Sequence, residues 1–280
     1  MLCLHPGKEE KDSLKDMVLM NANSCETDWL HEKKQKIVSL RPLIHCITNI
    51  VTVNDCANIL LAMGASPTMA HHPEEVAEVA ANCGALVLNM GATECLGAME
   101  IAGMAAKKAG KAVVLDPVGA SGSEFRRKQT LHLIETVKPD CIRGNISELK
   151  ALAKDAIVCR GVDAEQEVGA ENAFLTEYAN KTGAVLIASG AVDYVAVPSE
   201  KRILYGVFGG STMMTKVTGT GCMQSALLGA FLASEVSTEA LLACLQIMKL
   251  CAKRAEEKTM ATEGGTMQFR LNFIDEIYRF

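Results

Sequence analysis

The chain has 280 residues, and its 28 Lys+Arg against 33 Asp+Glu give a net charge of −5. Hydrophobic residues make up 49% and aromatic residues 4%, which excludes disordered and collagen-like chains and indicates an aliphatic core of helices packed on a sheet. The acidic balance offers no general attraction to nucleic acid or to an anionic membrane, so neither is expected as a partner.

The cysteine content and the amino-terminal sequence bear on whether the protein is exported. The eleven cysteines are odd in number, irregularly spaced and without a Cys-x-x-Cys pair, which favours reduced thiols over a disulfide framework. The amino end leads into the charged stretch Lys8–Asp16, and no later run approaches the roughly 18 apolar residues of a membrane span. We therefore expect a cytoplasmic protein that is neither exported nor membrane-spanning.

Residues 1–36 are densely charged and end in His31-Glu-Lys-Lys-Gln-Lys36. This pattern predicts an amino-terminal extension that is either a solvated helix or partly disordered. From residue 37 onward there is no composition break, internal repeat or linker. We expect residues 37–280 to form a single domain.

Short apolar runs alternate with Ala-rich amphipathic segments in this domain, which is typical of βαβ units. The expected strands are Leu43–Ile47, Ala85–Asn89, Ala112–Asp116 and Ala184–Ala188. Because these runs are apolar on both faces, they predict a three-layer α/β/α sandwich with a mostly parallel central sheet.

Helices and one hairpin complete the predicted α/β fold. The helices are expected over Val53–Met63, Pro73–Cys83, Thr93–Lys108, Glu124–Val137, Glu165–Thr182, Gly221–Ser234, Thr238–Lys258 and Leu271–Phe280. Tyr194–Val197 and Ile203–Val207 flank a Pro-containing turn and predict a β-hairpin at one edge of the sheet.

Polar residues follow several of the apolar runs, where an open parallel sheet binds its ligands. Asn89, Asp116 and Ser189 stand at three strand ends, and the strand near Cys141 runs into Arg143-Gly-Asn-Ile-Ser-Glu148. We expect these residues to meet at one edge of the sheet.

Asp116 and Glu148 are hard oxygen ligands of the kind that Mg²⁺ takes together with water and substrate phosphates. Arg143 adds a cation suited to phosphate. Each carboxylate also has a structural explanation: Asp116-Pro starts turns, and Glu148 suits the first turn of a helix capped by Ser147.

The segment Thr218-Gly-Thr-Gly-Cys222 precedes an apolar helix. Glycine N–H groups at a helix amino terminus form an anion hole for phosphate, although the spacing matches neither a Walker loop nor a dinucleotide fingerprint. Cys222 in the first turn is either a thiol whose pKa the helix dipole lowers, and hence a base or nucleophile, or a small buried hydrophobe.

Several separated motifs in the same order resemble the hydroxyethylthiazole kinase family of the ribokinase-like superfamily. The resemblance runs from about Lys36 to the carboxyl terminus. The segments that carry it are Pro42–Asn49 with Asn54-Asp55, Gly64–Ala70, Asn89–Gly91, Leu115–Gly119, Arg143–Asn145 with Glu148, and Thr218–Cys222.

The resemblance implies ATP-dependent phosphorylation of 4-methyl-5-(2-hydroxyethyl)thiazole, a step of thiamine synthesis and salvage. It implies that Met69 and Gly219 contact the thiazole and that Asn49 lines its pocket. It also implies a homotrimer with sites between neighbouring subunits.

The same resemblance places Arg143 and Ser189 on ATP, and we add Thr218 and Gly221 from the phosphate loop. The family commonly has Thr where this chain has Ser189, and the hydroxyl is retained. Asp116 and Glu148 would hold Mg²⁺.

Most ribokinase relatives have Asp at the position of Cys222. We expect Cys222 to be the catalytic residue, which orients the substrate hydroxyl and accepts its proton late, because a loose phosphoryl-transfer transition state needs little earlier proton removal.

Three other functions stay open from the sequence. A hydroxymethylpyrimidine or pyridoxal kinase of the same fold also phosphorylates a primary alcohol on a flat heterocycle. A thiol enzyme would use Cys222 as a covalent nucleophile with a His base such as His45. A non-catalytic heterocycle-binding protein would leave Asp116, Glu148 and Cys222 unexplained.

Overall fold

The computed structural model describes residues 17–22, 27–154 and 173–280. Their strands form one nine-stranded sheet in the order β1-β9-β8-β7-β6-β5-β4-β2-β3, with β8 antiparallel to both its neighbours and all other pairs parallel. The strands are β1 (Met17–Asn21), β2 (Leu43–Ile47), β3 (Ser66–Thr68), β4 (Ala85–Asn89), β5 (Ala112–Asp116), β6 (Cys141–Asn145), β7 (Val185–Ser189), β8 (Val192–Ala196) and β9 (Leu204–Phe208).

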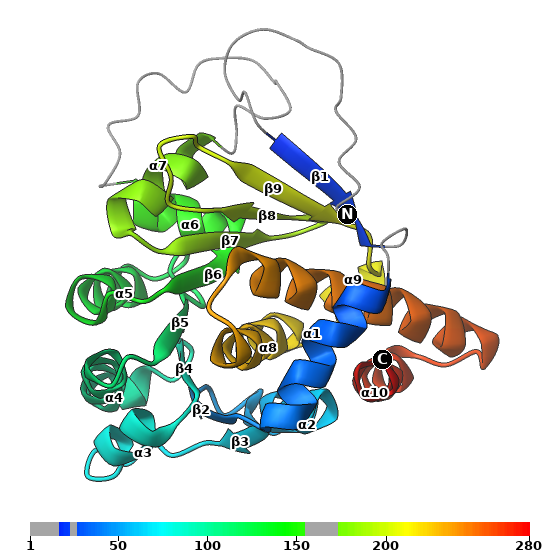
Figure 1. The fold of residues 1–280 in the computed structure, drawn as a ribbon, viewed down its shortest axis with the longest axis horizontal. Helices are drawn as coiled ribbons and strands as arrows, with labels where there is room; N and C mark the ends of the chain where they lie inside the picture. Colours follow the sequence, from blue (N-terminus) through cyan, green and yellow to red (C-terminus); the bar gives the residue numbers. More distant parts are fainter. Residues whose placement is uncertain (1–16, 23–26, 155–172) are drawn as a thin grey trace, which may run out of the picture.

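Helices cover both faces of the sheet, as Figure 1 shows. One layer holds α3 (Val76–Asn82), α4 (Leu96–Lys108), α5 (Glu124–Val137), α6 (Ile146–Ala153) and α7 (Ala173–Thr182). The other layer holds α1 (Thr27–Leu40), α2 (Val53–Met63), α8 (Thr220–Ser234), α9 (Thr238–Ala261) and α10 (Thr266–Arg279). The predicted three-layer α/β/α architecture with a mostly parallel sheet is confirmed.

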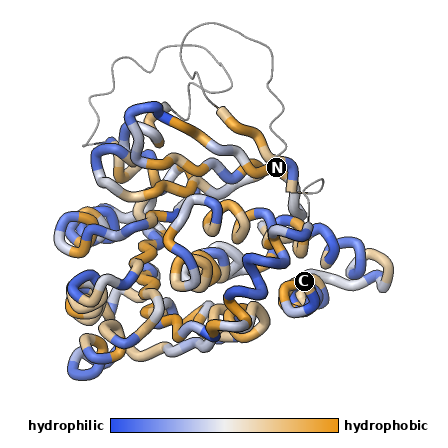
Figure 2. The backbone as a smooth tube through the Cα atoms, viewed as in Figure 1, coloured by the Kyte–Doolittle hydropathy of each residue, from blue (hydrophilic) through white to orange (hydrophobic). Residues whose placement is uncertain are grey.

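The core consists of two apolar clusters, one on each face of the sheet. In β4, Ala85 and Val87 face one cluster, whereas Leu86 and Leu88 face the other. This alternation explains why the strands are apolar on both faces, and the hydropathy colouring in Figure 2 shows the apolar strands between the helical layers. Helix α8 is buried on nearly all sides beneath α1, α2 and α9, which accounts for the apolar residues on all its faces.

The observed helix bounds differ from the predicted ones in places. Helices α2 and α5 have the predicted bounds, α3 begins only at Val76, and α9 extends to Ala261. The segment predicted as Thr93–Lys108 divides into the 3₁₀ turn Thr93–Cys95 and α4, and α10 begins at Thr266 instead of Leu271. The first part of the helix predicted from Glu165 lies outside the described residues.

The predicted hairpin forms, but its position at the sheet edge was wrong. Strands β8 and β9 pair antiparallel, and β1 then pairs parallel with β9, with Met17 opposite Leu204 and Asn21 opposite Phe208. The short apolar run of β1 lies within a charged segment, and the charged composition of that segment led to the prediction of an extension without a strand.

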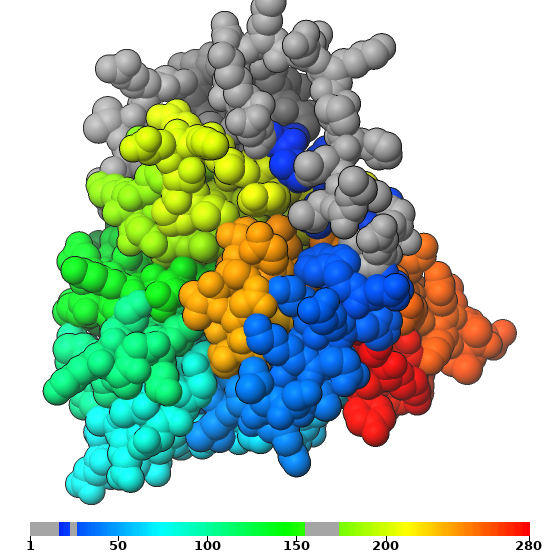
Figure 3. Space-filling view, in the orientation of Figure 1, coloured from blue at the N-terminus to red at the C-terminus, as the bar shows by residue number. Residues whose placement is uncertain are grey.

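The predicted domain boundary at residue 36 falls inside α1. Leu30 and Ile37 are buried on one face of this helix, and the Lys34 Nζ donates hydrogen bonds to the carbonyl oxygens of Ile277 and Tyr278 at 2.7 and 2.8 Å. Figure 3 shows α1 in blue beside the red α10. In the described part of the expected extension, β1 thus pairs into the sheet, and α1 packs on α8 and α9 with Lys34 bonded to α10.

The structure also bears on the membrane question. Across the described ranges, each helix is too short or too polar to cross a bilayer.

Candidate active site

The parallel register brings polar residues together at the carboxyl edge of the sheet. Asn89 of β4 lies opposite Asp116 of β5, and Asn145 of β6 lies opposite Ser189 of β7. The amino terminus of α8 faces this edge, since Ser225 in its second turn bonds Asp116. The expectation that these strand ends share one edge is confirmed.

Asp116 is fully buried at the centre of this edge. Its Oδ2 accepts hydrogen bonds from the Ser225 hydroxyl at 2.7 Å and from the Asn89 amide at 3.1 Å. Among the described residues its Oδ1 has no hydrogen-bond partner. Burial raises the pKa of Asp116 to about 6, and the nearby Arg143 guanidinium opposes that rise.

Two asparagines connect Asp116 to the Cys222 thiol. The Asn89 Nδ2 lies 3.2 Å from the Cys222 Sγ, and the Asn49 Nδ2 lies 3.5 Å from it. The Asn49 Nδ2 also donates to the Asn89 Oδ1 at 3.1 Å. Both amides present N–H groups to the sulfur, so they orient it and stabilise any negative charge on it.

Of the two alternatives for Cys222, a thiol with a lowered pKa was wrong. Burial is the main cause that raises the pKa of this thiol, and the negative charge of Asp116 adds to the rise. Hydrogen bonds from Thr52, Asn89 and Asn49 act in the opposite direction without reversing it. The thiol is therefore predominantly protonated near neutral pH.

Glu148 occupies the third position of α6 and is held by backbone groups. Its Oε2 accepts from the Asn145 N–H and its Oε1 from the Gly119 N–H, both at 2.9 Å. The Asn145 side chain in turn accepts from the Glu148 N–H, which completes a capping box. Asn145, and not Ser147, is thus the cap of α6.

The pair Asp116 and Glu148 fits a magnesium ion that keeps water and phosphate ligands. Asp116 presents an unpartnered carboxylate oxygen, and each oxygen of Glu148 retains a lone pair beyond its single hydrogen bond. The described residues contain no cluster of three or more His, Cys, Asp or Glu side chains suited to a metal. Such a donor set suits Mg²⁺, which commonly takes one or two carboxylates and completes its shell with substrate phosphates.

Arg143 is the middle residue of β6 and lies against the first turn of α8. Its Nη2 donates to the Ser189 hydroxyl at 2.7 Å, and its Nη1 is 3.8 Å from the Asp116 Oδ2. A Cβ at Gly221 would lie 2.5 Å from the Arg143 Nη1, so only glycine lets the guanidinium approach the helix start. The structure thus brings Arg143, Ser189 and Gly221 together.

Gly219 is the residue at which the phosphate loop turns into α8. Its φ of +86° belongs to the left-handed region, and a Cβ there would lie 2.7 Å from the Thr52 Cγ2. The first turn of a helix leaves its N–H groups without helical partners, so this turn presents donors to an anion. Thr218 is exposed immediately before it.

Met69 and Asn49 follow two neighbouring strands on the other side of Cys222. Met69 is partly buried after β3 and packs against the apolar cluster that contains α8. The buried His45 bonds the carbonyl oxygen of the next residue, Ala70, at 2.8 Å, so this imidazole holds the backbone beside Met69. Among the hydrogen bonds of the described residues, none joins His45 to Cys222.

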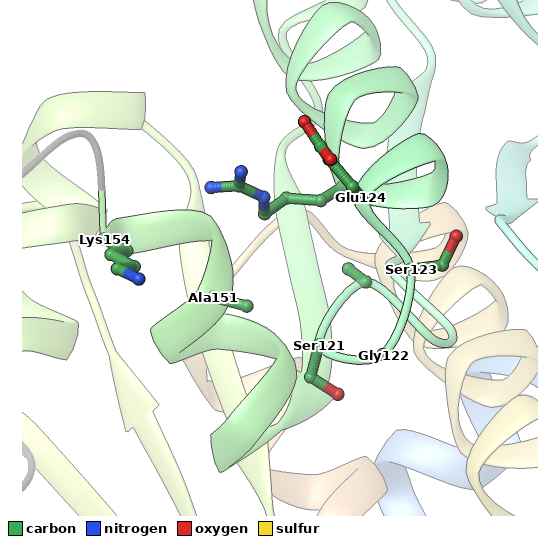
Figure 4. A pocket seen from close by; sticks show the side chains of 8 residues that line it. Ser121, Gly122, Ser123, Glu124, Ala151 and Lys154 are labelled. Carbon is green, nitrogen blue, oxygen red and sulfur yellow. The ribbon is translucent and has the colours of Figure 1, made fainter.

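A separate hollow of about 300 Å³ lies between the loop after β5 and helix α6. Figure 4 shows the turn with Ser121, Gly122 and Ser123 on one side and Lys154 on the other. None of the site residues predicted from the sequence is among those that line it. We therefore place the candidate active site at the strand ends and not in this hollow.

Comparison with known proteins identifies the family. The family model described as "Hydroxyethylthiazole kinase family" matches residues 34–280. The chain belongs to the hydroxyethylthiazole kinase family.

Relatives and a solved structure agree with this assignment. A hydroxyethylthiazole kinase of Clostridium acetobutylicum is 41% identical over 260 residues, covering 89% of this chain and 94% of the relative. One of Methanobrevibacter smithii is 38% identical over 263 residues, covering 89% and 91%. The solved structure of the hydroxyethylthiazole kinase protein of Pyrococcus horikoshii OT3 superposes with a TM-score of 0.78 at 35% identity, covering 90% of this chain and 93% of that one.

Within this family fold, sequence reasoning missed several residues that contact the predicted ones. Asn89 was noted as a strand end and as part of the motif Asn89–Gly91, without a role of its own, yet it bridges Asp116 and Cys222. Thr52 and Ser225 were not singled out, because Thr52 directly precedes a predicted helix and Ser225 lies within one. Polar side chains at otherwise buried positions of α8 were the available signal for Ser225.

Proposed function

We propose that this chain transfers the terminal phosphoryl group of ATP to the hydroxyethyl oxygen of 4-methyl-5-(2-hydroxyethyl)thiazole, in the cytoplasm, as a step of thiamine synthesis or salvage. One observation carries the proposal beyond family membership. Asn89 joins the buried carboxylate Asp116 to the thiol of Cys222 directly beside the amino terminus of α8. An anion hole, a metal-binding carboxylate and a proton-handling group thus lie at one site. The described cysteines are free thiols, which supports a reducing compartment.

The phosphates of ATP would bind at the first turn of α8. Arg143 and Ser189 approach this turn from β6 and β7, while Thr218 and Gly221 flank it in sequence. Asp116 and Glu148 would hold Mg²⁺, which neutralises charge on the transferring phosphoryl group when it is bound. These side chains fix the donor in place, which is most of what phosphoryl transfer asks of a protein.

The thiazole alcohol would bind between Met69, Asn49 and Gly219, with its hydroxyl toward the Cys222 Sγ. As the bond from oxygen to phosphorus forms and the bond to ADP breaks, the hydroxyl proton passes to the sulfur. Because burial and Asp116 raise the pKa of Cys222, the thiolate that accepts this proton is a minor form near neutral pH. We therefore expect the rate to rise with pH on the alkaline side.

We further propose that the protein is a homotrimer with its sites between subunits. Ile50 and Val51 directly follow Asn49, and their side chains are 85% and 68% exposed. An apolar pair beside a substrate pocket is explained when a second copy of the chain covers it. Sedimentation equilibrium of the wild type and of Ile50→Asp tests this. We expect the mass of a trimer for the wild type and a smaller mass for the variant, and an equal mass for both would contradict the interface.

The decisive experiment measures ADP release from MgATP with three acceptors in parallel: hydroxyethylthiazole, hydroxymethylpyrimidine and pyridoxal. We expect turnover with the thiazole alone, and its loss on addition of EDTA. Asp116→Asn should be inactive, whereas Asp275→Asn, which removes an exposed carboxylate on α10, should match the wild type. Turnover with another acceptor would show that the protein is a kinase for that alcohol instead. A folded wild type without turnover would refute the proposal that the protein is a kinase.

A further inference from the structure

A chain of polar side chains runs from Arg143 into the core between α8, α9 and β8. The Arg143 Nε donates to the Gln224 Oε1 at 2.7 Å, and the Gln224 Nε2 donates to the Asp193 Oδ2 at 3.1 Å. The Asp193 Oδ1 lies 3.4 Å from the Lys249 Nζ. Gln224, Asp193 and Lys249 are only 4%, 3% and 5% exposed, so these contacts are shielded from water.

The inner end of this chain also holds the turn that follows Ser189. The Lys249 Nζ donates to the carbonyl oxygens of Gly190 and Ala191, each at 3.2 Å. The Gly190 N–H donates to the Asp193 Oδ1 at 2.9 Å. Since Ser189 itself accepts from the Arg143 Nη2, the guanidinium is fixed from two directions that meet at the Asp193–Lys249 pair.

The chemistry of the partners fixes the orientation of the Gln224 amide. An arginine can only donate hydrogen bonds, and an ionised carboxylate can only accept them. Gln224 therefore presents its oxygen to Arg143 and its nitrogen to Asp193, and a flipped amide would lose both bonds. The buried ion pair therefore fixes the orientation of the Gln224 amide, and this amide in turn fixes the position of Arg143.

This arrangement holds Arg143 away from Asp116. Its Nη1 is 3.8 Å from the Asp116 Oδ2, beyond hydrogen-bonding distance, although the two opposite charges attract each other. We propose that Gln224, held by Asp193 and Lys249, is a positioning residue that keeps the Arg143 guanidinium directed at the nucleotide phosphates and off the metal-binding carboxylate. The inference rests on the proposed function, in which Arg143 contacts ATP.

The test compares two buried glutamines replaced by the near-isosteric methionine. Gln224→Met removes the relay, whereas Gln246→Met on α9 removes an equally buried amide whose recorded contact is with the Met20 sulfur. For Gln224→Met we expect a rise of about tenfold in the Kd and KM for ATP and in the Mg²⁺ concentration for half-maximal rate, the effect of losing one charge-assisted hydrogen bond. The KM for the thiazole should stay unchanged, and Gln246→Met should match the wild type in all four quantities.

Asp193→Asn keeps the proposal testable if Gln224→Met folds poorly, and where both variants fold they complete a double-mutant cycle. In Asp193→Asn the oxygen is needed at the Oδ1 position, where the Gly190 N–H donates and Lys249 lies, so the NH₂ group faces the Gln224 amide nitrogen. The Gln224 amide then turns, and Arg143 loses its acceptor. This variant alone should raise the Kd for ATP severalfold, but it should add little in the Gln224→Met background, because coupled residues are not additive. Additive effects, or an unchanged Kd for ATP in both single variants, would overturn the relay.

The readouts separate this inference from the proposed function. A wild type that binds MgATP but phosphorylates none of the three alcohols refutes the kinase and leaves the Kd comparison valid. A wild type that does not bind MgATP refutes both. An active wild type with equal ATP affinity in the two methionine variants refutes the relay alone.

Discussion

Replacing Asp116 with asparagine is expected to stabilise the folded protein near neutral pH while it removes the proposed kinase activity. The asparagine oxygen can keep the hydrogen bonds from Ser225 and Asn89, and its NH₂ group takes the place of the Oδ1 that has no partner among the described residues. The substitution therefore removes a buried charge and keeps both hydrogen bonds, while it gives up the attraction of the Arg143 guanidinium 3.8 Å away.

The size of the effect follows from the pKa of about 6 in the folded protein against an ordinary value of 3.8. The folded carboxyl binds its proton more tightly than the unfolded one, so its contribution to the free energy of unfolding falls as the pH rises between these values. The whole loss is about 3 kcal/mol, because one pKa unit corresponds to about 1.36 kcal/mol. The asparagine variant lacks this loss.

Urea unfolding in EDTA at about pH 5 and about pH 7.5 measures it. We expect the stability difference between Asp116→Asn and wild type to grow by about 1 kcal/mol, since about one unit of the titration lies in that interval. Glu200→Gln, which removes an exposed carboxyl, controls for the general effect of pH. A stability difference that is the same at both pH values would refute the argument that burial raises the pKa of Asp116.

Three further substitutions test the site. Cys222→Ala should lower kcat by about 10²- to 10⁴-fold with little change in the KM for the thiazole, and the rise in rate at alkaline pH should disappear. An unchanged pH–rate profile would show that the thiol has only a structural role. Glu148→Gln should raise the Mg²⁺ concentration that the reaction requires. It should also lower the free energy of unfolding by about 1–3 kcal/mol, because the new NH₂ group faces a backbone N–H. The same Mg²⁺ dependence in the variant and the wild type would show that Glu148 is not a metal ligand. Gly219→Ala should cost about 1–3 kcal/mol in thermal unfolding and weaken thiazole binding, since φ is +86°, whereas Gly97→Ala has open space and should cost nothing.

The sheet and its carboxyl edge could be predicted because the strands are buried on both faces. The runs at Ala85–Asn89 and Ala112–Asp116 are apolar throughout, so local sequence was sufficient to find them and the polar residues that end them. The same reasoning failed for Met17–Asn21. Its five residues are flanked by charges, and only pairing with β9 makes them a strand.

The electrostatics of the site depend on residues distant in sequence and were not predictable. The helix start at Cys222 suggested a lowered thiol pKa, but burial and Asp116, which arrives from β5, reverse the direction. The partners of Arg143 were missed for a similar reason. Gln224 and Lys249 lie in helices that read as apolar core, and only the fold shows that they meet Asp193.

The pairing of β1 with β9 sets an order on folding. Met17 is synthesised early, but Leu204 opposite it appears only when most of the chain has been made. During that interval β9 has no neighbour on its outer side, and an unpaired strand edge is open to pairing with other chains. The edge strand β1 is thus among the last to join the sheet, and a chain that began at Thr27 would leave β9 as the edge strand instead.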